Sequence, residues 1–330
     1  MPEAPPLEQA LELMLITYNR ADHLERTLGE IAAGPFGRCR LTILDNASTD
    51  RTPDVCRAFA EGREHVRVIP HARNLGVSPN YLRAVELATA PYTWVLADDD
   101  SWDYGDCDDV IAAIRAGDVD VISVGAPGQE AWERGLRTTT QDLWRRGSRF
   151  FLTFSFIPST IFRTELFGTT ALSRGYRNAD ALYPHFPFLA ELLEADRSVL
   201  VSKTEMVRRV HHGDLPSELF WMAAWTTSVA RHVADPAVRR RAIYEMRRDR
   251  REWLGLLAVS IAMEKLDHPE RVERELLELY AGFARDQRRW LALLAPLALV
   301  PRPLLRAVRA VKLRLNRSPG GPRPFDQLRI

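Results

Sequence analysis

Three consecutive carboxylates, Asp98, Asp99 and Asp100, directly follow an apolar run at residues 94–97. Adjacent negative charges repel one another unless a positive charge lies among them. A divalent cation such as Mg²⁺ or Mn²⁺, held by carboxylate oxygens and shared with a substrate phosphate, is the commonest way to supply that charge. Because side chains alternate along an extended strand, Asp98 and Asp100 are expected to point one way and Asp99 the other. We therefore predict that Asp98 and Asp100 hold the cation.

The surrounding elements must position these carboxylates. From residue 11 to about residue 124, short apolar β-type runs alternate with amphipathic helical runs, which is typical of an α/β domain with crossover helices. The predicted strands are 11–17, 40–44, 66–69, 93–97 and 119–124. The predicted helices are 21–33, 52–60, 79–88 and 108–116, with Ser48, Thr49 and Asp50 as capping residues before the second. An aromatic-rich run at 150–156, a polar loop at 174–180 and a helix at 188–194 follow.

Ligands of open α/β sheets bind beyond the carboxyl ends of the strands, where loops and helix N-termini meet. Polar clusters occupy three such places: residues 17–20 after the first strand, residues 45–50 after the second, and the aspartates after the fourth. One site built from three strand ends is the economical interpretation. The first strand is not followed by the glycine fingerprint of a dinucleotide site, and the sequence has no Gly-Lys-Ser/Thr phosphate loop, so NAD and ATP chemistry lose support.

Four motifs, in order along the first third of the chain, carry a family resemblance. They are Ile16-Thr17-Tyr18-Asn19-Arg20, Leu44-Asp45-Asn46-Ala47-Ser48-Thr49-Asp50, Arg73-Asn74-Leu75-Gly76 with Asn80, and Ala97-Asp98-Asp99-Asp100. On these residues the chain resembles a family-2 glycosyltransferase with the A-type fold. The resemblance implies a Rossmann-like mixed sheet with flanking helices, a nucleotide-sugar donor and a divalent metal. It fades after Val124, where the acceptor-binding parts of such enzymes diverge.

The residues at the first two strand ends are predicted to bind the nucleotide. Asp45 can accept a hydrogen bond from the ring N–H of uracil, whereas cytosine presents an acceptor there, which favours a UDP-type donor. Thr17, Asn19 and Arg20 can hold the base, the ribose or the diphosphate, with Arg20 as the natural charge partner of an anion. The alternatives are a turn-forming or capping role for Asp45 and a solvated arginine at a helix start.

Three residues around the next helix complete the predicted donor site. Asn74 and Gly76 lie in the turn before this helix, where Gly76 can instead serve only to provide a positive φ. Asn80 can reach the nucleotide from the helix, or it can lie on the helix surface.

The resemblance also implies roles on the metal side. Asp98 contacts the ribose, or the metal through water, while Asp100 binds the metal directly. Asp99 is a nucleotide contact or a structural residue. A late histidine often closes over the metal and diphosphate in such enzymes, so His212 is the candidate third ligand, with a plain surface loop at residues 211–214 as the alternative.

An inverting sugar transfer needs a base that takes the proton from the acceptor hydroxyl. Related enzymes place a carboxylate in the second half of the domain, and Asp180 fits that position, although the usual adjacent acidic residue is absent. His185 is the rival, because an imidazole with a near-neutral pKa can perform the same step. The segment around His185 also resembles deoxysugar transferases of O-antigen synthesis. The structural alternatives are a loop cap for Asp180 and a packed ring for His185.

Composition narrows the function classes. The chain has 330 residues, 46% hydrophobic content and a formal net charge of +1, so it can bury a core and is not a globally basic nucleic-acid binder. Its three cysteines show no paired spacing and are interpreted as reduced thiols. The first residues lack a cationic start followed by an apolar run. We therefore expect a cytoplasmic protein.

Residues 1–215 are predicted to be the catalytic domain and residues 216–330 an Arg-rich helical extension. Within the extension, residues 304–315 form a basic amphipathic helix with Leu305, Val308, Lys312 and Leu315 near one face. Such a helix can lie on an anionic membrane, at the inner membrane face, which suits a lipid-linked acceptor. The alternatives are a helix docked on the protein with its arginines in water, or a contact between copies in a homo-oligomer.

The sequence therefore predicts a metal-dependent, inverting glycosyltransferase that acts on a glycan or lipid-linked acceptor in cell-surface polysaccharide or O-antigen-like assembly. Tailoring of a secondary metabolite is the runner-up. A non-catalytic sugar-nucleotide-binding protein is the remaining alternative, and the intact aspartate triplet speaks against it.

Overall fold

The computed structural model describes residues 5–125, 132–147, 149–179, 182–208, 218–246 and 250–315. The chain divides into two compact units. The first comprises Met1–Leu215 together with Arg231–Met246, and the second comprises Pro216–Ala230 together with Arg247–Ile330.

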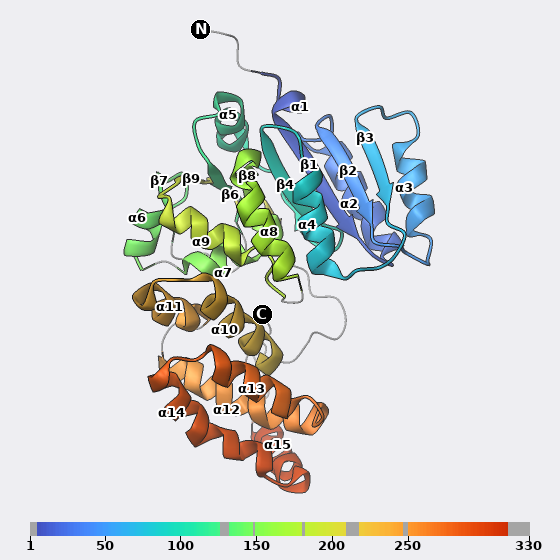
Figure 1. Ribbon diagram of the computed structural model, residues 1–330. Coiled ribbons are helices and arrows are strands. Elements are labelled where there is room, and N and C mark those ends of the chain that lie inside the picture. The colour runs from blue at the N-terminus through green and yellow to red at the C-terminus, as the bar shows by residue number, and fades with distance from the viewer. Residues whose placement is uncertain are drawn as a thin grey trace. The chain divides into compact units, whose positions relative to one another are not determined.

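The first unit is built on an eight-stranded mixed sheet, in the order β3-β2-β1-β4-β8-β6-β9-β7 (Figure 1). β1 pairs in parallel with β2 and β4, and β2 pairs in parallel with β3, whereas β8 is antiparallel to both of its neighbours. The predicted mixed sheet of the A-type fold is confirmed. The strands are β1 Leu11–Thr17, β2 Arg40–Asp45, β3 Val66–Pro70, β4 Tyr92–Ala97, β6 Val121–Ser123, β7 Arg137–Thr139, β8 Thr160–Arg163 and β9 Ser198–Val201.

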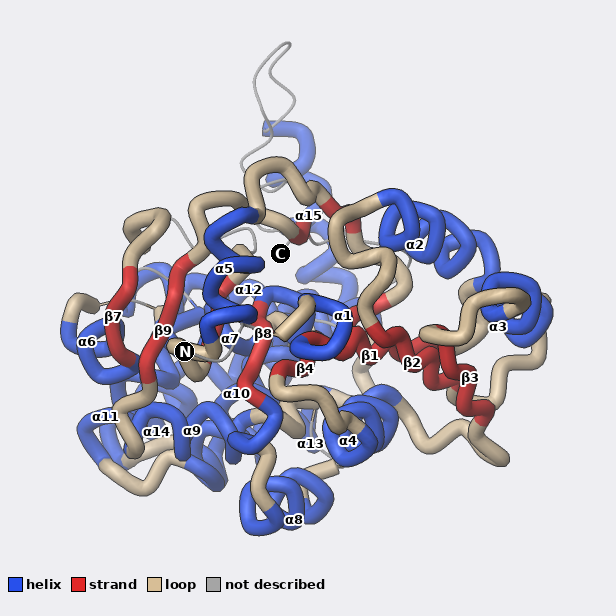
Figure 2. Tube along the Cα trace, turned by 90° about the horizontal axis from the view of Figure 1, so that it is seen from above, coloured by secondary structure: helices blue, strands red, loops and turns tan. Residues whose placement is uncertain are grey.

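Helices cover both faces of this sheet. α2 and α3 lie on one face of the parallel strands and α4 lies on the other (Figure 2). β1 is central and buried at all seven positions, because its runs of Leu, Met and Ile face helices on both sides. The helices of this unit are α1 Leu7–Ala10, α2 Ala21–Ala33, α3 Thr52–Ala60, α4 Val77–Leu87, α5 Asp108–Ala116, α6 Thr140–Arg145, α7 Phe150–Ser155, α8 Thr169–Arg177, α9 Phe186–Glu194 and α11 Pro236–Ile243.

The polar loop predicted at residues 174–180 was wrong, because Thr169–Arg177 forms helix α8. The buried positions of α8 include Ala171 and Gly175, which are small and give little hydrophobic signal. A Cβ atom on Gly175 would lie 2.6 Å from the Leu82 side chain, so the absence of a side chain lets α8 approach α4 closely. The close packing of α8 on α4 therefore favours this helix, although the sequence pattern does not indicate it.

Contacts with α7 and α6 join residues 231–246 to the rest of the first unit. The carboxylate of Glu245 accepts a hydrogen bond of 3.0 Å from the Leu152 N–H at the start of α7. The Arg241 guanidinium lies 3.9 Å from the ring centre of Trp144 on α6. Asp235 caps α11 by accepting hydrogen bonds from the first backbone N–H groups of that helix.

The second unit is helical, as predicted for this part of the chain. Its core includes Trp225, Trp253 and Leu279, and the Trp253 and Phe283 rings lie 5.3 Å apart. Its elements are residues 218–230 of α10 (Glu218–His232), then α12 Arg250–Asp267, α13 Val272–Gly282, α14 Arg285–Leu294, η4 Ala295–Leu299 and α15 Arg302–Leu315.

Two carboxylates are buried inside this helical unit. Glu264 of α12 and Glu275 of α13 are each only 1% exposed, and none of their four oxygens has a hydrogen-bond partner in the described ranges. Burial and the neighbouring charge of Glu264 raise the pKa of Glu275 to about 7, while Arg274, 3.9 Å from its carboxylate, opposes this. A proton on this pair therefore stabilises the unit.

We expect Glu275→Gln to stabilise the second unit at pH 8 but not at pH 5. The folded-state pKa is raised above the unfolded value, so the stabilising contribution is fully present below about pH 4.5 and is lost as the pH rises through about 7. Calorimetric unfolding should show a gain of about 1–3 kcal/mol at pH 8. The half-exposed Glu278 on the same helix provides the control Glu278→Gln, and equal pH dependence of both variants and the parent would contradict the assignment.

Candidate active site at the strand ends

The carboxyl ends of β1, β2 and β4 meet at one edge of the sheet. Thr17 of β1 lies beside Asp45 of β2, which in turn lies beside Pro70 of β3. The Thr17 hydroxyl donates a hydrogen bond of 2.5 Å to Oδ2 of Asp98, the first residue after β4. Parallel strands paired in register end together, which brings residues from distant parts of the sequence to one place. The predicted convergence of three strand ends is confirmed.

Arg20 lies among the aspartates. Its guanidinium pairs with the Asp99 carboxylate, and its Nε lies 4.0 Å from Oδ1 of Asp98. The alternation predicted for the triplet was therefore wrong, since Asp98 and Asp99 reach the same cation. The reason is that β4 ends at Ala97 and residues 98 and 99 form a bend. Part of the positive charge that the triplet needs comes from the protein itself.

Two of the three carboxylates in the triplet are buried. Asp98 and Asp100 are 5% and 2% exposed. Burial raises the pKa of Asp98 to about 7; the hydrogen bond from Thr17 opposes this shift, the charge of Asp99 adds to it, and Arg20 opposes it. A buried carboxylate with this balance is stabilised in its charged form by any further cation that reaches it.

Helix α2 holds the main chain of the triplet. Thr27 donates a hydrogen bond of 3.0 Å to the Asp98 carbonyl, and Nη2 of Arg26 lies 3.4 Å from the Asp100 carbonyl. Asp50, one of the predicted capping residues, accepts the N–H of Thr52 at 2.9 Å and the N–H of Ala21 at 3.3 Å. One carboxylate thus serves the first residues of both α3 and α2.

The carboxylates of Asp98 and Asp100 fit a divalent metal. Mg²⁺ and Mn²⁺ prefer oxygen ligands, and Mg²⁺ usually takes one or two carboxylates and completes its shell with water and substrate phosphate. Across the described residues, no group of three or more His, Cys, Asp or Glu side chains is placed to hold a metal. The two buried aspartates supply carboxylate oxygens of the kind that such a metal binds, and the rest of its shell would come from water and substrate phosphate.

Asn19 and Asp45 make local hydrogen bonds in the structure. Asn19 has a positive φ of 50°, its Oδ1 accepts the Thr49 N–H at 2.7 Å, and its own N–H donates to Ser48 at 2.9 Å. Oδ1 of Asp45 accepts the Ser48 N–H at 3.1 Å, which is the turn-forming alternative named above. Asp45 keeps its second oxygen, so this turn and a nucleotide contact are compatible.

Asn46 is a site residue that sequence reasoning missed. It is 2% exposed, and its side-chain amide donates to Oδ1 of Asn74 at 2.9 Å and to the Gly76 carbonyl at 3.1 Å. Its Oδ1 accepts the Leu75 N–H at 3.2 Å. Asn46 thus fixes the turn before α4, and Gly76 supplies the positive φ of 89° that this turn requires.

Asn80 lies on the buried side of α4, not on its surface. It is 3% exposed, and its Oδ1 has no hydrogen-bond partner in the described part of the chain. An unsatisfied buried amide oxygen is costly, so a donor group on a ligand is a natural partner for it.

Among the predicted catalytic residues, His185 is described and Asp180 lies outside the described residues. His185 is 4% exposed and lies edge-on to the rings of Tyr81 and Tyr183, at 5.8 and 5.9 Å between ring centres. Burial lowers its pKa to about 3, against a weak opposing effect of the Ser155 backbone. His185 is therefore neutral at physiological pH and packs as an aromatic ring.

The proposed third metal ligand, His212, also lies outside the described residues. The strand that precedes it, β10 Val207–Arg208, pairs antiparallel with β5 Ser101–Trp102, and Arg208 lies opposite Ser101. The chain thus enters residues 209–217 from a position next to the aspartate triplet.

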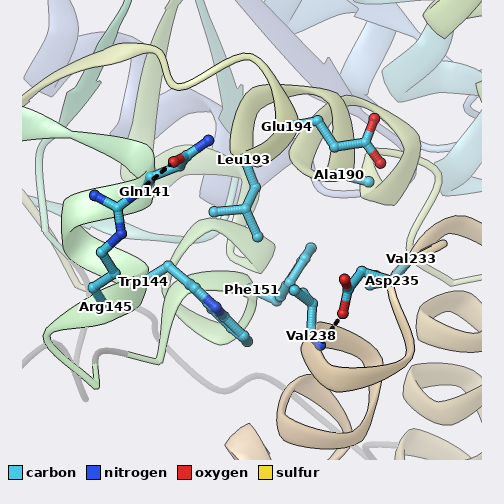
Figure 3. Close-up of a pocket in the computed structure, with 10 residues that line it drawn as sticks. All are labelled: Gln141, Trp144, Arg145, Phe151, Ala190, Leu193, Glu194, Val233, Asp235 and Val238. Atoms are coloured by element: carbon cyan, nitrogen blue, oxygen red, sulfur yellow. Dashed lines mark hydrogen bonds between the residues drawn. The ribbon is translucent and has the colours of Figure 1, made fainter.

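A separate hollow of about 220 Å³ lies among α6, α7, α9 and the start of α11 (Figure 3). Trp144, Phe151 and Leu193 form much of its wall. Its polar groups are engaged within the protein, since Asp235 caps α11 and Gln141 accepts a hydrogen bond from Arg145. None of its lining residues comes from the three strand ends, so it is not part of the site described above.

Comparison with known proteins defines the class. The structure resembles TarS residues 1–349 of S. aureus in complex with UDP-GlcNAc, with a TM-score of 0.52 and 16% identity over 87% of this chain and 90% of that one. It equally resembles the mannosyltransferase PcManGT of Pyrobaculum calidifontis in complex with GDP-Man and Mn²⁺, with a TM-score of 0.52 and 16% identity over 91% and 89% of the two chains. The fold is that of the A-type glycosyltransferases.

The sequence model of glycosyl transferase family 2 matches residues 13–174. Two curated relatives are 29% and 28% identical: the uncharacterized glycosyltransferase YibD of Escherichia coli over 91 residues, and the putative teichuronic acid biosynthesis glycosyltransferase TuaG of Bacillus subtilis over 86 residues. These matches cover 27% and 26% of this chain, and about a quarter and a third of the relatives. The segment at residues 13–174 contains all three strand ends and is similar to glycosyl transferase family 2.

We expect Asn46→Ala to destabilise the first unit by about 1–3 kcal/mol, because it removes three hydrogen bonds at a buried position. The turn at Asn74 should loosen, which hydrogen exchange of the Leu75 and Gly76 amides can follow. Ser48→Ala is the control, since Ser48 accepts only the N–H of Asn19 through its side chain. Unchanged exchange at these amides in Asn46→Ala would show that the turn does not depend on Asn46.

Proposed function

We propose that the protein transfers a sugar from a nucleoside diphosphate sugar to a hydroxyl group of an acceptor. The observation that carries the proposal is the joined strand-end site, in which Thr17, Asp45 and the buried Asp98 meet within a family-2 domain. Solved structures with this fold include one with UDP-GlcNAc and one with GDP-Man and Mn²⁺.

The strand-end residues are proposed to bind the donor. Asp45 receives the base, for which we favour uracil, through the carboxylate oxygen that Ser48 does not use. Thr17, Asn19 and Asn74 are proposed to contact the nucleotide, and Asn80 to offer it a buried amide oxygen. Arg20, which pairs with Asp99, can exchange that carboxylate for a phosphate of the donor.

Asp100, with Asp98, is proposed to hold Mg²⁺ or Mn²⁺, and His212 to add a ligand from the adjoining segment. When bound, the metal would neutralise the negative charge of the departing diphosphate. Arg20 contributes positive charge at the same place, so leaving-group stabilisation is shared between the chain and the metal.

The acceptor side is proposed to use Asp180 as the base. The acceptor oxygen forms the new bond to the anomeric carbon, the bond to the diphosphate breaks, and the acceptor proton passes to the carboxylate. His185 is a poor base because a pKa of about 3 leaves it little affinity for a proton at neutral pH. Its packing against Tyr81 and Tyr183 supports a structural role for His185.

We propose that the acceptor belongs to cell-surface polysaccharide assembly. TuaG, which shares a segment of this chain, is a putative teichuronic acid biosynthesis enzyme. An acceptor of that kind is a glycan or a lipid-linked saccharide, handled by the part of the chain beyond Val124.

We expect Asp100→Ala to lower kcat/KM by about 100-fold or more, with an unchanged melting temperature in the absence of ligand. A thermal-shift screen of UDP-, GDP- and dTDP-sugars with and without Mn²⁺ identifies the donor, because a ligand that binds only the folded state raises its stability. The shift should need Mn²⁺ in the parent and be lost in Asp100→Ala. Asp106→Asn, an exposed aspartate beyond the triplet, is the control. Absence of any nucleotide-sugar shift or transfer would overturn the proposal.

We expect His185→Phe to keep transfer within about tenfold of the parent and Asp180→Asn to lose about 100-fold or more. Between pH 5 and 8, the pH dependence of kcat/KM should be the same in His185→Phe as in the parent. Burial keeps the His185 ring neutral throughout that range. A profile whose acidic limb disappears in His185→Phe, with Asp180→Asn active, would make His185 the base instead.

A further inference from the structure

The second unit exposes apolar side chains where its last described helices meet. Leu293 at the end of α14, Leu299 at the end of η4, and Leu304 and Val308 on α15 are 66%, 84%, 56% and 58% exposed. We call these four residues, three leucines and Val308, the elbow leucine patch. Isolated exposed leucines are ordinary, but four largely exposed apolar side chains within sixteen residues are a concentration that water does not favour.

The patch faces outward because the opposite side of the same elements is used for packing. On α14, Gln287 and Leu291 lie four residues apart and are buried, while Leu293 is not. On α15, Leu304 and Val308 lie four residues apart on the exposed side, and Leu305 is half-buried. Of the face predicted for this helix, Val308 is exposed and Leu305 is half-buried. Lys312 and Leu315 have side chains outside the described set.

Two polar contacts hold α15 on the unit with this face outward. Nη2 of Arg302 donates a hydrogen bond of 2.7 Å to the Leu266 carbonyl at the end of α12. Arg309 lies 3.5 Å from the Asp267 carboxylate. Both contacts join α15 to the end of α12.

Along the sequence, the charge of the elbow segment is of one sign, and Asp267 of α12 pairs with one of its cations, Arg309. Between Asp286 and Asp326 the sequence has no acidic residue and nine cations: Arg288, Arg289, Arg302, Arg306, Arg309, Lys312, Arg314, Arg317 and Arg323. A second copy of this chain would bring the same cations face to face, which disfavours a symmetric dimer through this surface. Nucleic acid would leave the leucines without a role. An anionic lipid surface satisfies both, since its headgroups pair with arginines and its acyl region receives the leucines.

The length of the helices and the bend between the last two segments bear on whether the chain lies on a membrane or crosses it. Among the described residues, no single helix is long and apolar enough to span a bilayer. Only when taken together are the segments Gln287–Leu299 and Arg302–Ala310 long and apolar enough for a span. They are bent by 96° at the break between them. A segment of about 13 residues is shorter than the roughly 20 that a span needs.

We propose that the elbow leucine patch and its arginines dock the protein on an anionic membrane surface, with the leucines inserted at the headgroup boundary. The inference concerns a surface of the second unit and does not depend on sugar transfer. It specifies the residues that enter the lipid: Leu293, Leu299, Leu304 and Val308.

The full chain should co-sediment with vesicles that contain phosphatidylglycerol, bind vesicles of pure phosphatidylcholine at least about tenfold less, and be released by high salt. The double variant Leu299→Ser, Leu304→Ser should bind about tenfold or more weakly to the anionic vesicles. Arg306→Gln should weaken binding and its salt dependence. Leu277→Ser, at a 62% exposed leucine on α13 outside the elbow, is the matched control and should bind as the parent does.

Three results would overturn the proposal: no binding to anionic vesicles, equal binding by the double leucine variant, or binding that withstands both high salt and alkaline extraction as a spanning protein does. A dimer in light scattering that the double variant abolishes, without vesicle binding, would assign the surface to a second copy instead. The donor thermal shift of the double variant should match that of the parent, which separates this outcome from failure of the transferase proposal.

Discussion

The buried carboxylate of Asp98 is the constraint on which the strand-end site depends. A carboxylate at 5% exposure is costly unless it is hydrogen-bonded and charge-compensated. Thr17 supplies the hydrogen bond from β1, Thr27 holds the adjacent carbonyl from α2, and Arg20 supplies charge from the loop between them. These partners lie 71 to 81 residues away in sequence. The demand of one buried group thus ties β1, α2 and β4 into a single structure at the edge where a ligand would bind.

How much of this was visible in the sequence depends on whether the signal was local. The strands around Thr17, Asp45 and Ala97 could be predicted because apolar runs, turn residues and carboxylates follow one another in order. The meeting of their ends followed from the general geometry of parallel sheets. The end of the strand at Ala97 was predicted, but the pairing of Arg20 with Asp99 was not, because it depends on the bend at residues 98 and 99, for which the sequence pattern holds no signal.

Two misses have the same physical origin. Asn46 was treated as one of several polar turn residues, but its amide is buried and joins the turn at Asn74 to the end of β2. Helix α8 was treated as a loop, because Ala171 and Gly175 bury little apolar surface although they allow close packing on α4. In both cases the decisive quantity is a distance between segments far apart in sequence. The residue types in the sequence do not indicate that distance.

The two units place their unfavourable groups differently, and that difference bears on how each is used. The first unit buries charge at the strand ends and compensates it with Thr17 and Arg20, as a site for a charged ligand requires. The second exposes Leu299 and its neighbours in a part of the sequence, residues 287–325, that contains arginines and no acidic residue. If the acceptor is carried on a lipid, confining the enzyme to the membrane surface raises the effective concentration of that acceptor without any new contact in the catalytic unit. Affinity for the acceptor can then be modest, because the elbow supplies the proximity that the active site does not.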